Sequence, residues 1–404
     1  MTTVEGDLSI DLSHEQFGRR IPFEAFAELR RRAPLFWYEP DQYWVVSSHE
    51  LLSQINRDPE RFSSWGGPGG AGTQREADRN ESTFGAGRTI LTMDPPEHTA
   101  YRRLVSSSFT PRAIGAREDT VRRLAREVLS DFAASGGGDW VTEVASLLPF
   151  RVMADLMGME RADEQATLRR TNALLGGTDP ELAAGSPEEA AAMVAEGAAY
   201  ADRLIAEHRL HPRGDLVDQL LEARVEGDPL GDDDLRAWIT MYISGGAETT
   251  RHLIAHGLVC LLEWPDARRR VLEGHDMSLV VEEMLRFSSP VMHHSRWPLE
   301  TVEVDGRRIE AGQRATLWMV SANRDESVFE DPDRFDVTRD PNRHDALGAG
   351  GLHFCLGAGL ARLESRVLFE EARPYLERMQ MTGRPQRVRN NFFNAVKHLP
   401  VAVR

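Results

Sequence analysis

One of the two cysteines of the chain, Cys355, lies in a loop whose neighbours suit a reactive thiolate. The stretch from Leu347 to Gly357 reads LGAGGLHFCLG, and its glycines free the backbone to wrap closely around a sulfur. A helix is predicted to begin at Gly357, so its first N–H groups point back toward Cys355 and favour the thiolate. Small residues in its first turn, Ala358 and Ala361, leave space for a flat ligand. The pattern predicts a thiolate at Cys355 beside space for a flat ligand.

The other cysteine, Cys260, is predicted to be a small buried hydrophobe, because it stands in a helical run between leucines and a valine. Two cysteines cannot build a disulfide framework. A structural zinc site needs four N or S ligands, of which His353 and Cys355 supply two. No second cluster completes that set, so zinc is disfavoured.

A second constellation is the run from Gly245 to Thr250, GGAETT, inside a long predicted helix. Two adjacent glycines in a helix interior cost roughly 1 kcal/mol each relative to alanine. Such a cost suggests a close approach by another group or a local opening of the helix. Glu248 and Thr249 place an acid and a hydroxyl there. Two interpretations stay open: a packing kink with a solvated acid, or a proton-delivery pair beside a small-molecule site.

A third constellation, Glu283 and Arg286, stands three residues apart on a predicted helix, so the two side chains share a face and can pair. An exposed pair of this kind contributes little to stability. A functional interpretation of the pair is favoured by the turn Pro332-Asp333-Arg334-Phe335, in which Arg334 could supply a second guanidinium.

The elements that position these residues are mostly helical. An acidic start at Asp232-Asp233-Asp234 and a largely apolar run predict a helix over 232–262, which at about 1.5 Å per residue would cross the whole molecule. Further helices are predicted over 22–32, 279–287 and 357–379. Breaks are predicted at the glycines of 136–138, 176–177 and 185–187.

Short β elements accompany these helices. A hairpin is predicted from 36–38 and 43–46, and strands over 302–304, 308–309 and 315–318. The Gly-rich stretch 65–87 is predicted to be a lid over a pocket. We expect a mainly α fold of one domain over 1–404, with β-rich parts at about 20–60 and 295–320 and a helical core at about 90–290 and 340–380.

Composition narrows the classes of function. No apolar run approaches the length of a membrane span, and the first residues lack the basic-then-apolar pattern of a signal peptide, so we expect a cytoplasmic protein without membrane contact. The net charge of −16 argues against nucleic acid as a partner. Lys397 is the only lysine, which restricts Schiff-base chemistry to the C-terminal end.

Taken together, the motifs resemble the cytochrome P450 family in its soluble bacterial form, over about residues 22–400. The Cys355 loop resembles the haem loop, Glu248-Thr249 the acid–alcohol pair, and Glu283-x-x-Arg286 the E-x-x-R motif with Arg334 as its third member. The other matching segments are PPEHTAYR (95–102), SANRD (321–325), and the separate residues Arg296 and His353.

The resemblance implies a monooxygenase with haem b (iron protoporphyrin IX), O₂ as co-substrate, and Cys355 as the iron ligand. Glu248 and Thr249 would be catalytic and deliver protons. Glu283, Arg286 and Arg334 would be structural. Residues expected to contact the haem, the first four through its propionates, are His98, Arg102, Arg296, His353, Gly357 and Ala361.

One departure from the family pattern lies in the haem loop. The family usually has Phe seven residues before the cysteine and Gly after it, where this chain has Gly348 and Ala349. The phenyl shield beside the sulfur is missing unless Leu347 replaces it. We expect a shifted reduction potential.

The substrate is expected to be hydrophobic, because the residues predicted to line its pocket are mostly apolar. His293 is read either as a ligand-binding group or as a core or surface histidine. The C-terminal segment from Asn394 to Val401 resembles that of family members acting on steroids, terpenoids and lipids. The alternative function is tailoring of a polyketide or other natural product in secondary metabolism. Besides the 65–87 loop, the predicted lining residues are Met241, Ser244, Gly245, Ala247, Val291, Met292, His293, Phe392 and Phe393.

Electrons are expected from NAD(P)H through a ferredoxin reductase and a ferredoxin, because no flavin or iron–sulfur module is apparent in the chain. A locally basic docking face is expected around Arg103, Arg112, Arg343 and Arg362. Two other classes stay open. A haem-thiolate sensor would need no acid–alcohol pair, and a peroxygenase usually replaces that pair with Arg-Pro.

Overall fold

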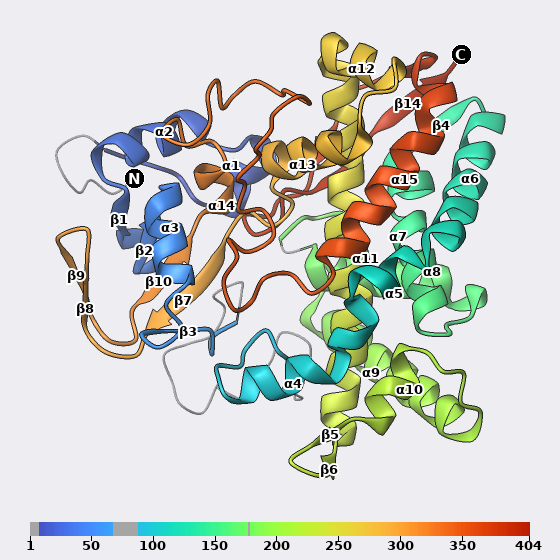
Figure 1. Ribbon diagram of the computed structural model, residues 1–404, viewed down its shortest axis with the longest axis horizontal. Helices are drawn as coiled ribbons and strands as arrows, with labels where there is room; N and C mark the ends of the chain where they lie inside the picture. Colours follow the sequence, from blue (N-terminus) through green and yellow to red (C-terminus); the bar gives the residue numbers. More distant parts are fainter. Residues whose placement is uncertain (1–7, 68–87, 177) are drawn as a thin grey trace.

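The computed structural model describes residues 8–67, 88–176 and 178–404 (Figure 1). Most of the predicted lid falls on residues 68–87, outside the described residues. In Figure 1 the N-terminal helices and most of the strands lie on the left and the larger helices on the right, where β4 and β14 also lie. The mainly α fold expected from the sequence is confirmed.

The helices begin and end as follows: α1 His14–Arg19, α2 Phe23–Arg32, α3 His49–Asn56, α4 Glu97–Ser106, α5 Pro111–Gly115, α6 Glu118–Ala134, α7 Leu147–Leu156, α8 Glu164–Leu175, α9 Pro187–Leu210, α10 Leu216–Glu222, α11 Asp232–Glu263, α12 Pro265–Leu272, α13 Met277–Ser288, α14 Met319–Ala322 and α15 Ala358–Leu376. In the described part of the chain, no helix is long and apolar enough to span a membrane.

The strands are β1 Leu35–Tyr38, β2 Tyr43–Val46, β3 Phe62–Ser63, β4 Gly137–Asp139, β5 Arg224–Val225, β6 Asp228–Pro229, β7 His294–Pro298, β8 Val302–Val304, β9 Arg307–Ile309, β10 Arg314–Leu317, β11 Met379–Met381, β12 Gln386–Arg387, β13 Val396–His398 and β14 Pro400–Val403.

The long helix α11 is the axis of the helical region, and its predicted extent is confirmed to within one residue. Helices α7, α9, α13 and α15 pack against it. Apolar side chains from these helices form one continuous core that includes Trp238, Leu258 and Phe369. Cys260 lies buried in this core, as expected. The buried middle of α11 is therefore a rigid wall for whatever lies beside it.

The five-stranded sheet has the order β1-β2-β10-β7-β3. The predicted hairpin is confirmed: β1 and β2 pair antiparallel, with Trp37 opposite Trp44. Strand β10 lies parallel to β2 and antiparallel to β7, with Ala315 opposite Arg296. Because β7 is an inner strand, its backbone holds Arg296 in a fixed position.

A strand appears where the sequence predicts only a break. The glycines at 137 and 138 begin β4, which pairs with β14 so that Ala402 faces Gly137. A Cβ on Gly137 would lie 2.2 Å from the Val401 carbonyl oxygen, and its φ is +108°. Glycine is required here because the neighbouring strand leaves no space for a side chain.

Candidate active site

Cys355 follows a tight loop and directly precedes helix α15. Its N–H donates to the Leu347 carbonyl (2.9 Å), and the Gly357 N–H donates to the Cys355 sulfur. The side chain is exposed because it opens on two internal cavities, but protein atoms surround its other sides. This burial raises the pKa of the thiol, whereas the Gly357 N–H and the guanidinium of Arg102 lower it. The sulfur is thus placed to bond to a ligand in a cavity.

The first of the two, which we call the central cavity, has a volume of about 290 Å³ and a mostly apolar lining. One face of α11 forms one wall, through Met241, Gly245, Thr249 and Leu253, which are spaced four residues apart. The first turns of α15 contribute Gly357 and Ala361. This arrangement suits a flat ligand between α11 and the Cys355 loop.

Beside His353, which lines the central cavity, lies a second histidine, His98, which is not itself part of the lining. His98 is fully buried, and neither ring nitrogen has a hydrogen-bond partner among the described residues. The His353 ring lies 4.3 Å from the His98 ring, and its Nε2 is also unpartnered in that part of the chain. Burial, Arg102 and Arg296 together lower the pKa of His98 to about 4.

Arg102 and Arg296 complete this polar group and line the same cavity. Burial lowers the pKa of Arg296 to about 10, and Arg102 donates to the Phe354 carbonyl (2.6 Å). Buried donors without acceptors are costly, and an anionic group between them would accept their hydrogen bonds. The residues therefore fit a flat ligand with carboxylates at this edge, as haem has.

Asn56, which the sequence analysis did not single out, holds this region together. Its Nδ2 donates to the Gly348 carbonyl (2.7 Å), and its Oδ1 accepts from Arg296 (2.6 Å) and His294 (3.0 Å). A Cβ on Gly351 would lie 2.5 Å from the same amide nitrogen. No local motif marks Asn56, because its partners lie more than 200 positions away along the chain.

The two adjacent glycines of α11, Gly245 and Gly246, have different surroundings. A Cβ on Gly246 would lie 2.6 Å from the Met153 sulfur of α7, so this glycine permits close helix packing. A Cβ on Gly245 would meet no atom within 4 Å, and this residue lines the central cavity. Thr249 donates from its hydroxyl to the Gly245 carbonyl (3.0 Å) and lines the same cavity.

Glu248 lies on a different face of α11 from Thr249. It is only 1 % exposed and pairs with Arg251 (2.5 Å), with His252 at 3.8 Å. The interpretation as a solvated acid is therefore wrong. Burial raises the pKa of the carboxyl, and Arg251 lowers it. Arg251 also donates to the Asn172 side chain of α8 (2.5 Å), so the acid is fixed by its neighbours rather than free in the cavity.

Three of the predicted pocket residues, Met241, Gly245 and Val291, line the central cavity. Ser244 and Ala247 do not, because they lie on other faces of α11, and Ser244 donates to the Thr240 carbonyl (2.6 Å). Cavity-lining residues absent from the prediction include Ile90, Leu91, Met153 and Leu253. The four-residue spacing after Thr249 was the available signal for Leu253.

Four more predicted pocket residues lie outside the central cavity. Met292 is fully buried in the core beside Trp318, and the His293 ring packs 4.5 Å from Trp318. Within 291–294 only Val291 and His294 line the cavity, so this segment does not follow the two-residue alternation of a regular strand. Phe392 and Phe393 pack against each other in a small separate cluster. His293 is therefore a core histidine.

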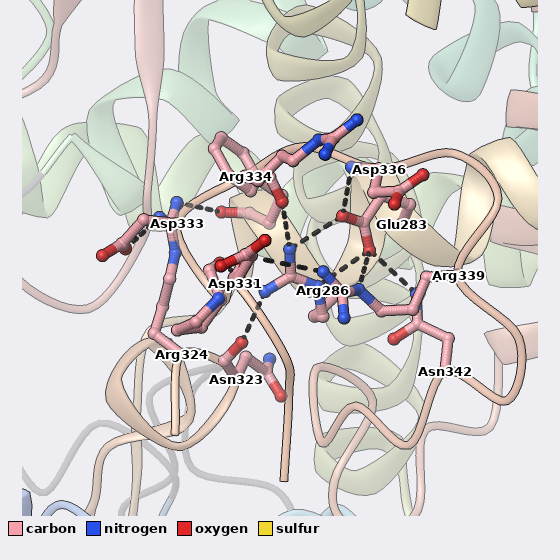
Figure 2. Close-up of polar contacts among 12 residues, drawn as sticks. Glu283, Arg286, Asn323, Arg324, Asp331, Asp333, Arg334, Asp336, Arg339 and Asn342 are labelled. Atoms are coloured by element: carbon pink, nitrogen blue, oxygen red, sulfur yellow. Dashed lines mark hydrogen bonds and ion pairs between the residues drawn. The ribbon is translucent and has the colours of Figure 1, made fainter. Parts of the chain in front are cut away.

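The Glu283–Arg286 pair is completely buried and bidentate, at 2.7 and 2.8 Å (Figure 2). Arg286 also donates to the carbonyls of Asn323, Pro332 and Arg334. The Asp336 N–H and the Asn342 amide donate to Glu283.

The sequence prediction that Arg334 supplies the second guanidinium is wrong. Only its carbonyl takes part, and Figure 2 shows its side chain pointing away from Glu283. Arg339 takes that place, with its Nε 3.4 Å from Glu283.

In the haem loop, Gly348 and Ala349 both adopt positive φ, +99° and +51°. A larger residue at Gly348 would be strained in this conformation. Leu347 and Gly348 line the central cavity, as Cys355 does, and the replacement of the phenyl shield by Leu347 stays a prediction. The shift of the reduction potential stays a prediction.

The second, outer cavity has a volume of about 650 Å³ and lies on the other side of the Cys355 loop. Its lining includes Phe354, Arg102, Arg362 and Arg366. Arg103, Arg112 and Arg343 are exposed, whereas Arg362 is half-buried and paired with Glu282 (2.6 Å).

Comparisons with known proteins agree with this site. The family model for cytochrome P450 matches residues 188–372. The steroid C26-monooxygenase of Mycolicibacterium smegmatis is 34% identical over 95% of this chain and 90% of its own length. The linalool 8-monooxygenase of Pseudomonas putida is 32% identical over 96% and 97%. The Mycobacterium marinum cytochrome P450 CYP268A2, solved with pseudoionone, has a TM-score of 0.90 and 33% identity, covering 99% and 100%.

The chain therefore belongs to the cytochrome P450 family. It is a monooxygenase. The family brings with it haem, O₂ and electrons delivered by partner proteins.

Proposed function

We propose that this monooxygenase acts on a hydrophobic small molecule of terpenoid, steroid or lipid type, held in the central cavity. The observation that carries the proposal is the mostly apolar lining of a cavity that Cys355 closes at one end. Relatives that oxidise linalool and steroids favour the same class of substrate. Met241, Leu253 and Val291 would contact the substrate and exclude water from it.

Cys355 would ligate the iron of haem b, and four residues would hold the propionates: His98, Arg102, Arg296 and His353. Their unpartnered or cationic donors support this assignment. Gly357 and Ala361 keep the α15 side thin enough for the ring. When bound, haem supplies the oxidising chemistry with O₂ and two electrons.

Thr249 would hold and donate a proton on the cavity side of α11, because its hydroxyl faces the cavity while donating to the Gly245 carbonyl. Glu248 is the acid next to it in the chain, but Arg251 holds it away from the cavity. A rotation of Glu248 away from Arg251 would therefore precede any proton transfer to Thr249. The raised pKa of the carboxyl favours its holding a proton once unpaired.

Electrons would arrive from a ferredoxin that docks over the outer cavity. The exposed arginines Arg103, Arg112 and Arg343 give this face the charge that an acidic protein prefers. Reduction by such a partner should weaken steeply with salt, because exposed charges are screened.

The test is an optical titration of the ferric holoprotein with linalool, a sterol, a methyl-branched fatty acid and a macrolide. A saturable shift of the Soret band to shorter wavelength with one of the first three supports the proposal. A shift with the macrolide alone would overturn the substrate class and favour tailoring of a natural product. Product formation with a ferredoxin system but not with peroxide separates the monooxygenase from a peroxygenase.

A further inference from the structure

A third cavity lies between α8, α9 and α11 and shares no lining residue with the central cavity. Its volume is about 530 Å³, within the range of small-molecule sites. On α11, Thr240 and Ser244 line this α8–α9 cavity, whereas Met241 and Gly245 line the central one. In Figure 1, α9 runs beside the N-terminal half of α11. One helix therefore separates two cavities.

Helix α9 forms its wall with small and apolar residues, including Met193, Val194, Gly197 and Ala198. Gly197 stands in the interior of this 24-residue helix, where glycine costs roughly 1 kcal/mol relative to alanine. A Cβ there would meet no atom within 4 Å. No packing neighbour requires the glycine, and its missing side chain keeps the cavity open.

One cation in the lining has no acidic partner. Arg170 donates to the Thr167 hydroxyl (2.8 Å), and among the described residues no carboxylate lies within ion-pair distance of it. Its guanidinium lies 5.2 Å from the centre of the Tyr200 ring. By contrast, Arg236, in the same lining, pairs with Asp202 (2.6 Å). These contacts fix the position of Arg170 and leave other N–H groups of its guanidinium available to a ligand.

Other charges nearby leave this group unneutralised. Glu196 and Asp163 attract Arg170 only at longer range, and Asp163 pairs with Arg203 (3.1 Å). Tyr200 also lines the cavity and is 5 % exposed, yet its hydroxyl has no hydrogen-bond partner in the described part of the chain. A half-buried guanidinium and a buried hydroxyl thus stand beside the apolar wall of α9.

We propose that the α8–α9 cavity is a second ligand site, for a small apolar carboxylate. The apolar body would lie along α9 at Gly197 and Met193, where its burial is favourable. The carboxylate would accept charge-assisted hydrogen bonds from Arg170 and a hydrogen bond from Tyr200. This site is independent of the substrate in the central cavity.

The test uses the holoprotein with dodecanoate and dodecanol as probes, by calorimetry for the number of sites and by the Soret band for the central cavity. We expect one dodecanoate to bind at a site whose occupancy does not shift the Soret band, which we call the silent site, in addition to any dodecanoate that shifts the band from the central cavity. Arg170→Leu should weaken that binding by about tenfold or more, the scale of one lost hydrogen bond to a charged group, and leave dodecanol binding within about twofold. Arg169→Leu, which removes the exposed neighbouring arginine, should match the wild type.

Gly197→Phe should fill the cavity and abolish the silent site for both probes, with thermal stability equal to or above that of the wild type. If Gly197→Phe does not fold, Gly197→Leu replaces it, and silent-site binding in Gly197→Leu and in Arg170→Leu is compared with that of the wild type. Absence of a silent site in the wild type, or unchanged dodecanoate binding in Arg170→Leu, would overturn the proposal. Neither result depends on whether any substrate shifts the Soret band.

Discussion

Two buried polar clusters lie near Cys355, and they differ in how completely their atoms are bonded. Arg286 uses all five of its N–H donors, on Glu283 and on three carbonyls (Figure 2). At the central cavity, both nitrogens of His98 and the Nε2 of His353 have no partner among the described residues. The first cluster is complete by itself and so stabilises the fold. The second is complete only with an anionic ligand.

The largest effect is expected at the complete cluster. Arg286→Ala leaves Glu283 buried without its partner and should lower the free energy of unfolding by about 3–5 kcal/mol, measured by denaturant unfolding. Arg334→Ala is the matched control and should change it by less than about 0.5 kcal/mol, because only the carbonyl of that residue is used. Equal losses in both variants would show that the Arg334 side chain, and not only its carbonyl, stabilises the cluster.

A smaller effect on folding, and a larger one on ligand retention, is expected at the incomplete cluster. His98→Phe removes a buried group that has no partner, so unfolding of the haem-free protein should change by less than about 1 kcal/mol. Haem transfer to apomyoglobin should become about tenfold faster or more.

His293→Phe is the control for that variant, because His293 is also buried but packs on Trp318 outside the cavity. It should leave the rate of haem loss unchanged. Equal acceleration in both variants would mean that any change in a buried histidine loosens the site.

Thr249→Ala should leave folding and haem content unchanged but uncouple turnover. Its hydroxyl faces the central cavity, so product formed per O₂ consumed should fall while peroxide rises. Ser244→Ala removes a hydroxyl from the neighbouring face of α11, outside that cavity, and should keep the coupling of the wild type. Unchanged coupling in Thr249→Ala would remove the proton-donating role.

The smallest effect concerns another paired acid, Glu282. Burial raises the pKa of this carboxyl, but hydrogen bonds from Arg362 and His344 outweigh it and set the pKa at about 2, below the usual 4.5. Since the folded-state pKa is lowered, the stabilisation is present above pH 4.5 and is lost as the pH falls toward 2. The advantage of wild type over Glu282→Gln in unfolding free energy should therefore shrink across that range. A constant difference would show that the pairing does not depend on charge.

The same comparison shows what the sequence can predict. Periodicity and caps are local, so the extents of α11 and the β1–β2 hairpin followed from them, and the loop motif located Cys355. Arg334 was taken for Arg339 because the choice depends on how a turn closes on a distant helix. Met292 and His293 were misplaced because the chain from Val291 to His294 does not alternate as a regular strand does, and the sequence does not show which of its side chains face the cavity. Asn56 carried no signal, since its three partners come from elsewhere in the fold.

That asparagine has an evolutionary consequence. One side chain bonds the haem loop at Gly348 and the β7 residues His294 and Arg296. Substitutions in the loop and in β7 are therefore not independent, because each acts through the same amide. We expect epistasis between these segments. A directed-evolution library that randomises the loop alone would then discard variants that a compensating change at position 56 would rescue.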